Sequence, residues 1–305
     1  MTAISENFLV RGQHKIYYAA YGNPKGTAFL FVHGGPGGGT SPEVLNFFDL
    51  TKSLVVLVDQ RGCGQSLPTG AIDANTTQHL LEDFEDIRQE LAIENWVLFG
   101  GSWGSTLALI YAQTYPQVVS GLILRGIFLG GKIGTNWLTK PDGASRIFPE
   151  AWAELVANVP ELAASKDHLA TLHQKACIED HEHTAIAFAR WEGRISCHQE
   201  QPELIKTMST YPVGYTVGKI ELHYMRHDFF IPENFILDNA AKLSMPVEIV
   251  HGRYDVVCPL DHAYSLNKAV SHANLHIMPN SGHSANEDEI KTLLTKLAHN
   301  ACNTK

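Results

Sequence analysis

One segment places a serine in a sharp turn between glycines. Residues 100–104 read Gly-Gly-Ser-Trp-Gly, with Ser102 at the centre. The apolar run 96–99 comes before this segment, and the run 106–112, with helical character, comes after it. A tight strand-to-helix turn of this kind holds the serine in a strained backbone conformation and leaves its hydroxyl free to attack a substrate. The pattern therefore predicts Ser102 as a nucleophile, whereas an ordinary glycine-rich turn is the alternative.

Two later segments offer the base that a serine needs to become nucleophilic, and an acid to support that base. Asp255 follows the apolar run 247–250 and a glycine turn. His283 follows the run 274–278 and a second turn. His283 would take the serine proton near neutral pH, and Asp255 would fix the imidazole tautomer and stabilise the imidazolium. Alone, they could be a turn residue and one of 16 histidines, but their order after Ser102 predicts a catalytic triad.

Acyl transfer also needs two N–H donors for the oxyanion. The residue after the nucleophile, Trp103, is expected to supply one of them. The other is expected from residues 33–39, which read His-Gly-Gly-Pro-Gly-Gly-Gly, because glycines let the main chain approach a substrate. We favour the N–H of Gly35, with Gly34 as the alternative. A phosphate-binding loop is a competing interpretation, but the segment lacks the Lys-Ser/Thr ending of a P-loop.

Strand-like and helix-like runs alternate around these segments. Residues 76–91 have apolar side chains on one helical face and acidic ones opposite. Several strand-like runs are continuously apolar, as expected of strands that are covered on both faces. The full set of strand-like runs is residues 14–21, 28–32, 54–59, 96–99, 119–124, 247–250 and 274–278. The alternation predicts an α/β fold with a mostly parallel sheet flanked by helices, and the Ser-Asp-His order makes it an α/β-hydrolase fold.

Residues 131–240 differ from the rest of the chain. Their apolar positions have helical spacing, as in 151–159 and 185–191, and prolines interrupt them. Strand signals lie on both sides, so we interpret this segment as a helical cap that is inserted into a catalytic core made of residues 1–130 and 241–305. The cap is expected to form the substrate pocket. A separate downstream domain is the alternative, but it would leave the second half of the sheet without a first half.

Composition excludes several classes of protein. The chain has 305 residues, of which 44% are hydrophobic and 18% charged, so a disordered or fibrous protein is ruled out. The net charge is −9 and no basic cluster is present, which argues against a nucleic-acid partner. The odd number of cysteines favours a reducing cytoplasm. The first residues resemble no signal peptide, and no apolar run approaches the roughly 20 residues of a membrane span. We expect a cytoplasmic protein that binds no membrane; the oligomeric state stays open.

Three motifs together are specific. They are residues 33–39, residues 59–66 (Asp-Gln-Arg-Gly-Cys-Gly-Gln-Ser) and residues 100–107 (Gly-Gly-Ser-Trp-Gly-Ser-Thr-Leu). With Leu-Arg-Gly-Ile-Phe at 124–128, they make the sequence similar to the proline iminopeptidases, which are serine peptidases of the α/β-hydrolase superfamily. The second motif is shared more widely and reads equally well as a structural loop. The resemblance covers nearly all of the core and implies an exopeptidase that releases N-terminal proline from peptides without a cofactor.

Such an exopeptidase must recognise a free, protonated amine. Carboxylates at the closed end of a pocket would do this, because a buried carboxylate without a cation is costly. The resemblance implies that Glu192 and Glu221, both in the cap, bind the amine. It also implies that Phe128 contacts the proline ring and that Arg125 is a buried supporting cation. The alternatives are two solvated glutamates on helix faces and ordinary packing after a strand.

The sequence departs from the family pattern at two places in the cap. Residues 223–225 read His-Tyr-Met, where the family usually has His-Tyr-Phe, and residues 168–183 follow no family pattern. The size of the pocket, and so its tolerance of residues other than proline, is left open by these departures.

A possible metal site also lies in the cap. His173, Cys177 and His181 are spaced by four residues, so a single helix would place them on one face, where such residues bind zinc. The His-Glu-x-x-His pattern is absent, and neighbouring acidic residues are typical of a solvated face. We therefore expect no metal and no cofactor.

Two other functions compete with the exopeptidase. The first is an amidase, esterase or lactonase that acts on amino-acid derivatives with the same triad. The second is a ligand-binding protein on a disabled hydrolase fold, against which the intact triad and glycine loop argue. Epoxide hydrolases and haloalkane dehalogenases are set aside because they need aspartate where Ser102 stands.

Overall fold

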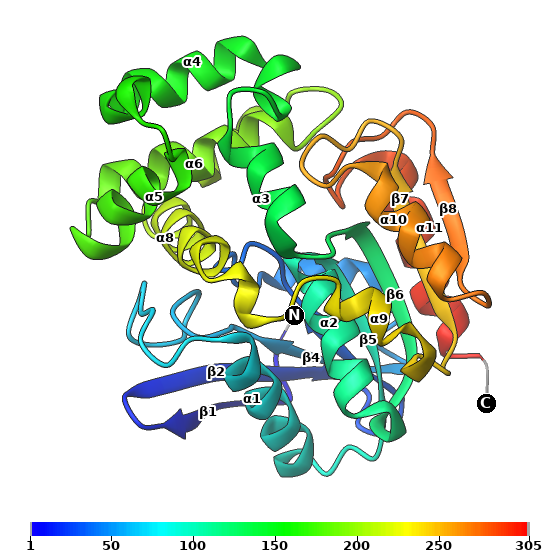
Figure 1. Ribbon diagram of the computed structural model, residues 1–305. Coiled ribbons are helices and arrows are strands. Elements are labelled where there is room, and N and C mark those ends of the chain that lie inside the picture. The colour runs from blue at the N-terminus through cyan, green and yellow to red at the C-terminus, as the bar shows by residue number, and fades with distance from the viewer. Residues whose placement is uncertain (1, 304–305) are drawn as a thin grey trace.

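The structure is a computed structural model that describes residues 2–303 (Figure 1). Within these residues eight strands form one sheet, in the order β1-β2-β4-β3-β5-β6-β7-β8. All neighbouring pairs from β4 to β8 are parallel, whereas β1 pairs with β2, and β2 with β4, in antiparallel fashion. The strands are β1 (Ser5–Arg11), β2 (His14–Gly22), β3 (Thr27–Val32), β4 (Ser53–Val58), β5 (Trp96–Ser102), β6 (Val119–Ile127), β7 (Val247–Gly252) and β8 (Asn274–Met278). The predicted mostly parallel α/β sheet is confirmed, and β1 is an addition that was not predicted.

Side chains of the central strands alternate between two apolar clusters, one on each face of the sheet. In β3, Leu30 and Val32 belong to the first cluster, whereas Phe29 belongs to the second. Helices α1 (Thr77–Glu90), α2 (Trp103–Thr114) and α10 (Leu260–Ala269) contribute to the first cluster, and α11 (Asp288–Ala301) contributes to the second. Because both faces of the sheet are covered, the side chains on both sides of these strands are apolar. Such a strand therefore appears in the sequence as a continuous apolar run and not as an alternation of apolar and polar residues.

The amphipathic segment predicted at 76–91 forms α1. Its N-cap is Thr76, whose side chain accepts a hydrogen bond from the N–H of His79 and so satisfies one of the free donors at the helix start. The apolar face is buried against the sheet, as the predicted pattern required. Across residues 2–303, no helix is both long and apolar enough to cross a membrane.

Every residue from 131 to 240 is described, and none lies in a strand. Figure 1 shows α4, α5, α6 and α8 grouped over one end of the sheet. Gly218 lets α8 approach α6 closely, since a Cβ there would collide with the carbonyl of Ala185. In contrast, α9 lies beside α2, where Gln113 donates to the carbonyl of Ile236 at 2.8 Å. The helices are α3 (Gly131–Thr139), α4 (Pro149–Asn158), α5 (His168–His173), α6 (Glu182–Ile195), α7 (Pro202–Met208), α8 (Val213–Arg226) and α9 (Phe235–Asp238).

Candidate active site

The nucleophile turn joins the end of β5 to the start of α2. Ser102 has a φ of 58° and a ψ of −130°, a backbone conformation that residues other than glycine rarely adopt. A Cβ on Gly100 would collide with the carbonyl of Gly104, and a Cβ on Gly104 would collide with the carbonyl of Val32. The two glycines therefore let the chain pass through a turn too tight for side chains. This turn places Ser102 at the N-terminus of α2.

The predicted acid and base lie together at the ends of two neighbouring strands. Asp255 follows β7 and His283 follows β8, and Asp255 Oδ2 lies 2.7 Å from His283 Nδ1. The second oxygen, Oδ1, accepts the N–H of Cys258 at 2.8 Å. Burial alone would raise the pKa of Asp255, but the neighbouring His283 and His251, together with these hydrogen bonds, hold that pKa below its ordinary value. An ionised Asp255 keeps the proton of His283 on Nδ1, so Nε2 is left to accept a proton.

The loop that carries His283 is held from two sides. The N–H of His283 donates to the carbonyl of Ser196 at 2.8 Å. Arg125 Nη1 donates to the carbonyl of His283 at 2.6 Å. Arg125 also lines, with Gly34 and Gly101, a cavity of about 190 Å³ behind the nucleophile turn. The structure thus puts Arg125 in a positioning role for His283.

Gly126, which sequence reasoning did not single out, makes room for the acid–base pair. Its φ is +54°, and a Cβ there would lie 2.8 Å from His283 Cε1 and 3.4 Å from Asp255 Oδ2. Any side chain at this position would displace the imidazole. The only signal in the sequence was a glycine inside a strand, which indicates a close approach without saying what approaches.

His251, in β7, is a second residue that sequence reasoning missed. Its Nδ1 accepts the N–H of Ile127 at 3.1 Å, so its proton is on Nε2, which lies 2.8 Å from the carbonyl of Cys258. Burial lowers the pKa of His251 and keeps it neutral. His251 therefore connects the end of β6 to the turn that holds Asp255. A histidine within an apolar run was visible in the sequence, but its partners were not.

The glycine-rich loop after β3 is fixed by a buried histidine. The N–H of Gln60 donates to His33 Nε2 at 3.0 Å, so the proton of His33 is on Nδ1, which donates to the carbonyl of Gly34 at 2.9 Å. The N–H of Gly38 donates to the same carbonyl at 3.2 Å. The N–H of Gly35 lies in the same trans peptide unit as the carbonyl of Gly34. In a trans peptide the N–H and the C=O point in opposite directions, so the N–H of Gly35 points away from the two donors that the carbonyl accepts.

This loop touches the nucleophile. A Cβ on Gly34 would lie 3.1 Å from the Cβ of Ser102. Trp103 is the first residue of α2, where backbone N–H groups have no partner within the helix. The indole of Trp103 donates to Gln60 Oε1 at 2.9 Å, and Gln60 Nε2 donates to the carbonyl of His33 at 2.9 Å, so Gln60 links the turn to the loop. The geometry favours Gly35 over Gly34 as the second oxyanion donor.

Glu192 and Glu221 come together from two helices of the cap. Glu192 lies on α6 and Glu221 on α8, and their exposed fractions are 6% and 4%. The Oε2 atom of each is buried without a hydrogen-bond partner. Burial raises the pKa of Glu221 well above its ordinary value, and the adjacent Glu192 carboxylate raises it further. Within residues 2–303, neither glutamate has an ion pair with a cationic side chain, so no ion pair within the protein compensates the two carboxyl groups.

The two helices that carry the glutamates contact the catalytic elements directly. Ser196, just after α6, donates to the carbonyl of Glu192 at 2.8 Å and accepts the N–H of His283. On α8, Thr216 Oγ1 donates to the carbonyl of Gly37 at 2.9 Å. About two turns further along α8, the ring of Tyr224 lies 4.9 Å from the indole of Trp103. The two helices therefore meet the nucleophile turn, the glycine loop and the histidine loop.

Phe128 lies in an aromatic cluster beside the nucleophile turn. Its ring meets Phe229 edge-on at 4.9 Å between centroids, and Phe229 stacks on Trp103 at 5.7 Å. The N–H of Phe128 donates to Ser105 Oγ at 3.1 Å. The ring is thus an apolar surface next to the residue expected to donate to the oxyanion.

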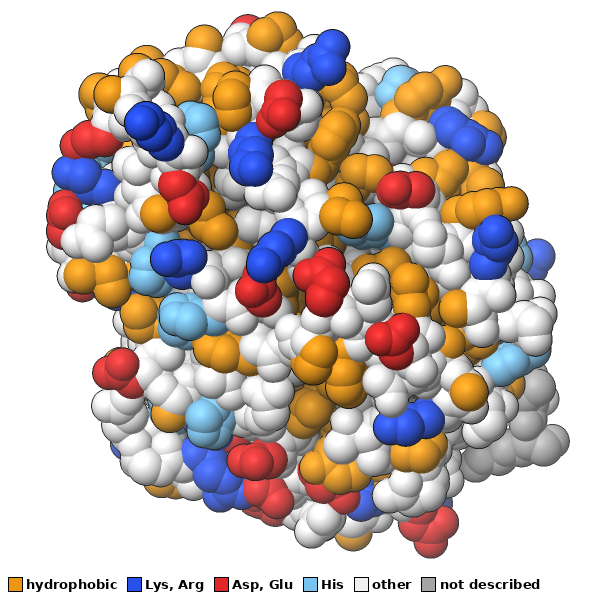
Figure 2. Space-filling view, viewed as in Figure 1, with side chains coloured by type: hydrophobic (Ala, Val, Ile, Leu, Met, Phe, Trp, Pro, Cys, Tyr) orange, Lys and Arg blue, Asp and Glu red, His pale blue; other side chains and the backbone are white. Residues whose placement is uncertain are grey.

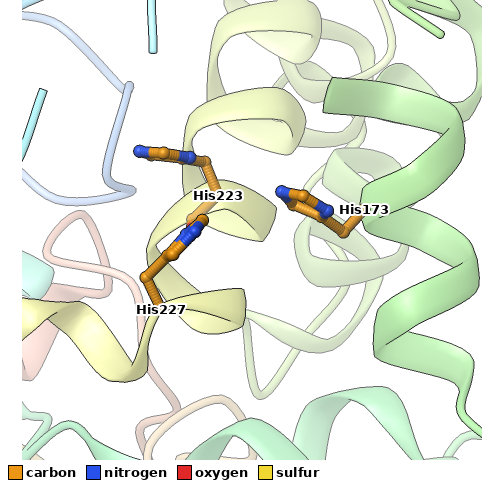
Figure 3. A group of neighbouring side chains, drawn as sticks. All are labelled: His173, His223 and His227. Atoms are coloured by element: carbon orange, nitrogen blue, oxygen red, sulfur yellow. The ribbon is translucent and has the colours of Figure 1, made fainter. Parts of the chain in front are cut away.

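The metal group considered from sequence spacing does not form. The α-helix α5 ends at His173, and a π-helical turn over Gln174–Ile178 changes the phase of the chain. Cys177 Sγ donates to the carbonyl of Lys219 at 3.1 Å, and burial raises the pKa of this thiol to about 12. His181 pairs with Thr184 instead. His173 faces a different pair of histidines, His223 and His227 (Figure 3).

Comparisons with known proteins agree with this geometry. Residues 27–290 match the family model described as the alpha/beta hydrolase fold. A proline iminopeptidase of Xylella fastidiosa is 41% identical over 286 residues, which cover 92% of this chain and 90% of that protein. A proline iminopeptidase of Arabidopsis thaliana is 39% identical over 295 residues, which cover 95% and 77%. The crystal structure of a Mycobacterium smegmatis proline iminopeptidase has the same fold, with a TM-score of 0.67 at 18% identity over 98% of this chain and 99% of that one.

Proposed function

The chain belongs to the proline iminopeptidases within the α/β-hydrolase family, and from that premise we propose that it hydrolyses the bond after an N-terminal proline through Ser102, Asp255 and His283. The substrates are peptides or small compounds with a free N-terminal proline. The division into a core and a substrate-binding cap, and a cytoplasmic location, remain proposals from the sequence.

The first half of the reaction forms an acyl-enzyme. Ser102 Oγ attacks the carbonyl carbon of the N-terminal proline while His283 Nε2 takes the hydroxyl proton. Asp255, 2.7 Å from His283 Nδ1, stabilises the imidazolium. The N–H groups of Trp103 and Gly35 bind the oxyanion of the tetrahedral intermediate. Collapse of this intermediate breaks the C–N bond, and the departing amine takes the proton from His283, which leaves proline esterified to Ser102.

The second half frees the enzyme. A water molecule attacks the ester carbonyl while His283 takes one of its protons, and the same two N–H groups bind the second oxyanion. When this intermediate collapses, the ester bond to Ser102 breaks and the oxygen of Ser102 regains its proton from His283. Free proline leaves. The cycle consumes one water molecule and uses no cofactor.

The buried pair of Glu192 and Glu221 is the single observation that carries the exopeptidase assignment. A protonated N-terminal proline is a secondary ammonium ion with two N–H groups, and two carboxylates offer one acceptor to each. The substrate cation would replace the proton that the high pKa of Glu221 holds in the free enzyme. Since α6 and α8 both contact the loops around Ser102, the pair would hold the amine close to the nucleophile, where only the first peptide bond reaches Ser102.

A panel of chromogenic aminoacyl substrates, each with and without an N-terminal acyl group, tests the proposal. The acyl group removes the cation and adds bulk where the pocket ends. The pair is then left without its cationic partner, and the lost interaction amounts to about 3–5 kcal/mol by analogy with broken buried ion pairs. We therefore expect blocked prolyl substrates to react about a hundredfold to a few thousandfold more slowly than free ones. Equal rates would instead favour an amidase, esterase or lactonase that uses the same triad.

A further inference from the structure

Three histidines outside the triad lie together in the cap. His173 is the last residue of α5, whereas His223 lies on α8 and His227 directly follows that helix. One ring nitrogen from each lies within 4.8 Å of one from each of the others. The ring centroids of His223 and His227 are 4.7 Å apart, and those of His173 and His227 are 5.8 Å apart. Figure 3 shows His173 reaching from its helix toward the other two rings.

The hydrogen bonds of this group leave ring nitrogens available as ligands. His227 Nδ1 lies 2.8 Å from the carbonyl of His223, and a carbonyl can only accept, so Nδ1 carries the proton and Nε2 has a free lone pair. Histidines that bind metals are commonly held in this way, with the other ring N–H donated to a carbonyl. Both ring nitrogens of His223 are buried without a hydrogen-bond partner. A buried polar atom without a partner is costly, and a bound ion would remove that cost at His223.

Two charged side chains near the group have opposite effects on a bound cation. The positive charge of Arg226 lies close enough to His173 to repel a bound cation. The negative charge of Asp73 lies close enough to His223 to attract one.

We propose that His173, His223 and His227 bind one divalent transition-metal ion of the zinc class. Neutral imidazoles suit zinc, copper and nickel, and do not suit magnesium or calcium. Three histidines and a fourth position for water make a tetrahedral zinc site. With Zn–N distances near 2.05 Å, the ligand atoms would lie about 3.3 Å apart, so small side-chain rotations must close the group.

Solvent reaches this site from outside the catalytic pocket. His227 is exposed, and His173 and His223 are half-buried. Figure 2 shows histidine side chains at the surface over this part of the cap. None of the three belongs to the triad, so an ion here would link α5 to α8 without taking part in the chemistry. Since Glu221 lies two residues before His223 on α8, the ion would restrain the helix that carries one of the amine-binding carboxylates.

Calorimetric titration of the full chain with zinc chloride tests this site, with magnesium chloride as the matched ion. We expect one zinc per chain with a micromolar Kd, and no heat with magnesium. His173→Ala and His227→Ala should each weaken zinc binding at least tenfold. The control is His183→Ala, an exposed cap histidine outside the group, and it should bind zinc like the wild type.

Thermal unfolding gives a second readout that does not depend on activity. Zinc at about a hundred times its Kd should raise the Tm of the wild type and of His183→Ala by about 5 °C. It should leave the Tm of His173→Ala and His227→Ala unchanged, and the Tm without zinc shows whether each variant is folded. The proposal is overturned if the wild type binds no zinc at about 1 mM. It is also overturned if His173→Ala and His227→Ala keep the wild-type Kd, or if His183→Ala loses binding equally.

Discussion

Replacing Glu221 with glutamine separates two consequences of burying a carboxylate pair. Glutamine keeps the size of the side chain and one oxygen acceptor, but it carries no charge. The variant Glu221→Gln should therefore bind the substrate amine less well and should also be more stable than the wild type when no substrate is present. Both effects come from the same observation, which is that Glu192 and Glu221 are 6% and 4% exposed and that the Oε2 atom of each is buried without a hydrogen-bond partner.

The expected loss in catalysis follows from one charge-assisted hydrogen bond. A hydrogen bond to a charged group contributes about 1.5–3 kcal/mol. Its removal corresponds to about a ten- to 150-fold lower kcat/KM for substrates with a free N-terminal proline. Glu192→Gln should lose a similar factor, because each carboxylate accepts one N–H of the prolyl ammonium. A small neutral ester, which needs only the triad and the oxyanion donors, should react at the wild-type rate in both variants.

The expected gain in stability follows from the pKa of Glu221. Its pKa in the folded protein is raised well above the ordinary value of 4.5. Between these two values the folded protein holds a proton that the unfolded chain has released, so the free energy of unfolding falls as pH rises through this window. Glutamine removes this dependence. The variant should therefore be more stable than the wild type at pH 8, and the difference should shrink as pH falls through this window toward 4.5.

The assay measures kcat/KM for a prolyl anilide and for the neutral ester, and urea unfolding at pH 8 and pH 4. Glu182→Gln, an exposed cap glutamate on the same helix as Glu192, is the matched control and should change neither quantity. An equal loss on the ester and on the prolyl anilide would mean that Glu221 supports the fold. A wild-type rate on the prolyl anilide, or a lower stability at pH 8, would refute the reasoning from buried charge.

Three further predictions concern the triad and its surroundings. Ser102→Ala should lower kcat by several orders of magnitude, and a serine-directed inhibitor should label Ser102 alone; labelling of another residue would contradict its role. Gly126→Ala should lower kcat about a hundredfold in a folded protein, because its Cβ would lie 2.8 Å from His283 Cε1. Gly121→Ala on the same strand meets no atom nearer than 3.8 Å and serves as control, so equal kcat values in the two variants would remove the steric argument. A chelator should leave prolyl hydrolysis unchanged, since the triad needs no metal; a loss that zinc restores would show otherwise.

The central fold was predictable because its signals are local. Buried strands read as apolar runs, and the helix at 76–91 has an apolar face that a window of the sequence reveals. Asp255 and His283 were found because each follows a strand, in the order that the fold imposes on the chain. The structure brings them to 2.7 Å across 28 positions of sequence. Strand β1 was missed because it lies at the edge of the sheet, where its mostly exposed side chains give no apolar run.

Other parts depend on contacts that no window of the sequence contains. The space that Gly126 leaves is filled by Asp255 and His283, which follow β7 and β8 far along the chain. The spacing of His173, Cys177 and His181 indicated one helical face, but it assumed an unbroken α-helix. The π-helical turn at Gln174–Ile178 interrupts the α-helix. The histidines that lie beside His173 come about fifty residues later in the sequence, one on α8 and the other directly after it. Equal spacing places residues together only where the helix is continuous.

The residues that need a fixed geometry and the residues that bind the amine lie in different parts of this chain. The triad and oxyanion donors stand at the ends of parallel strands that are buried on both faces, which limits their movement. The carboxylates stand on two helices that meet the core through a few hydrogen bonds, among them Ser196 to His283 and Thr216 to Gly37. Changes within α6 or α8 can thus alter which N-terminal residue is accepted and leave the acyl-transfer chemistry intact. Strain in α6 or α8 would reach the His283 loop and the glycine loop directly, because these hydrogen bonds join the two helices to both loops.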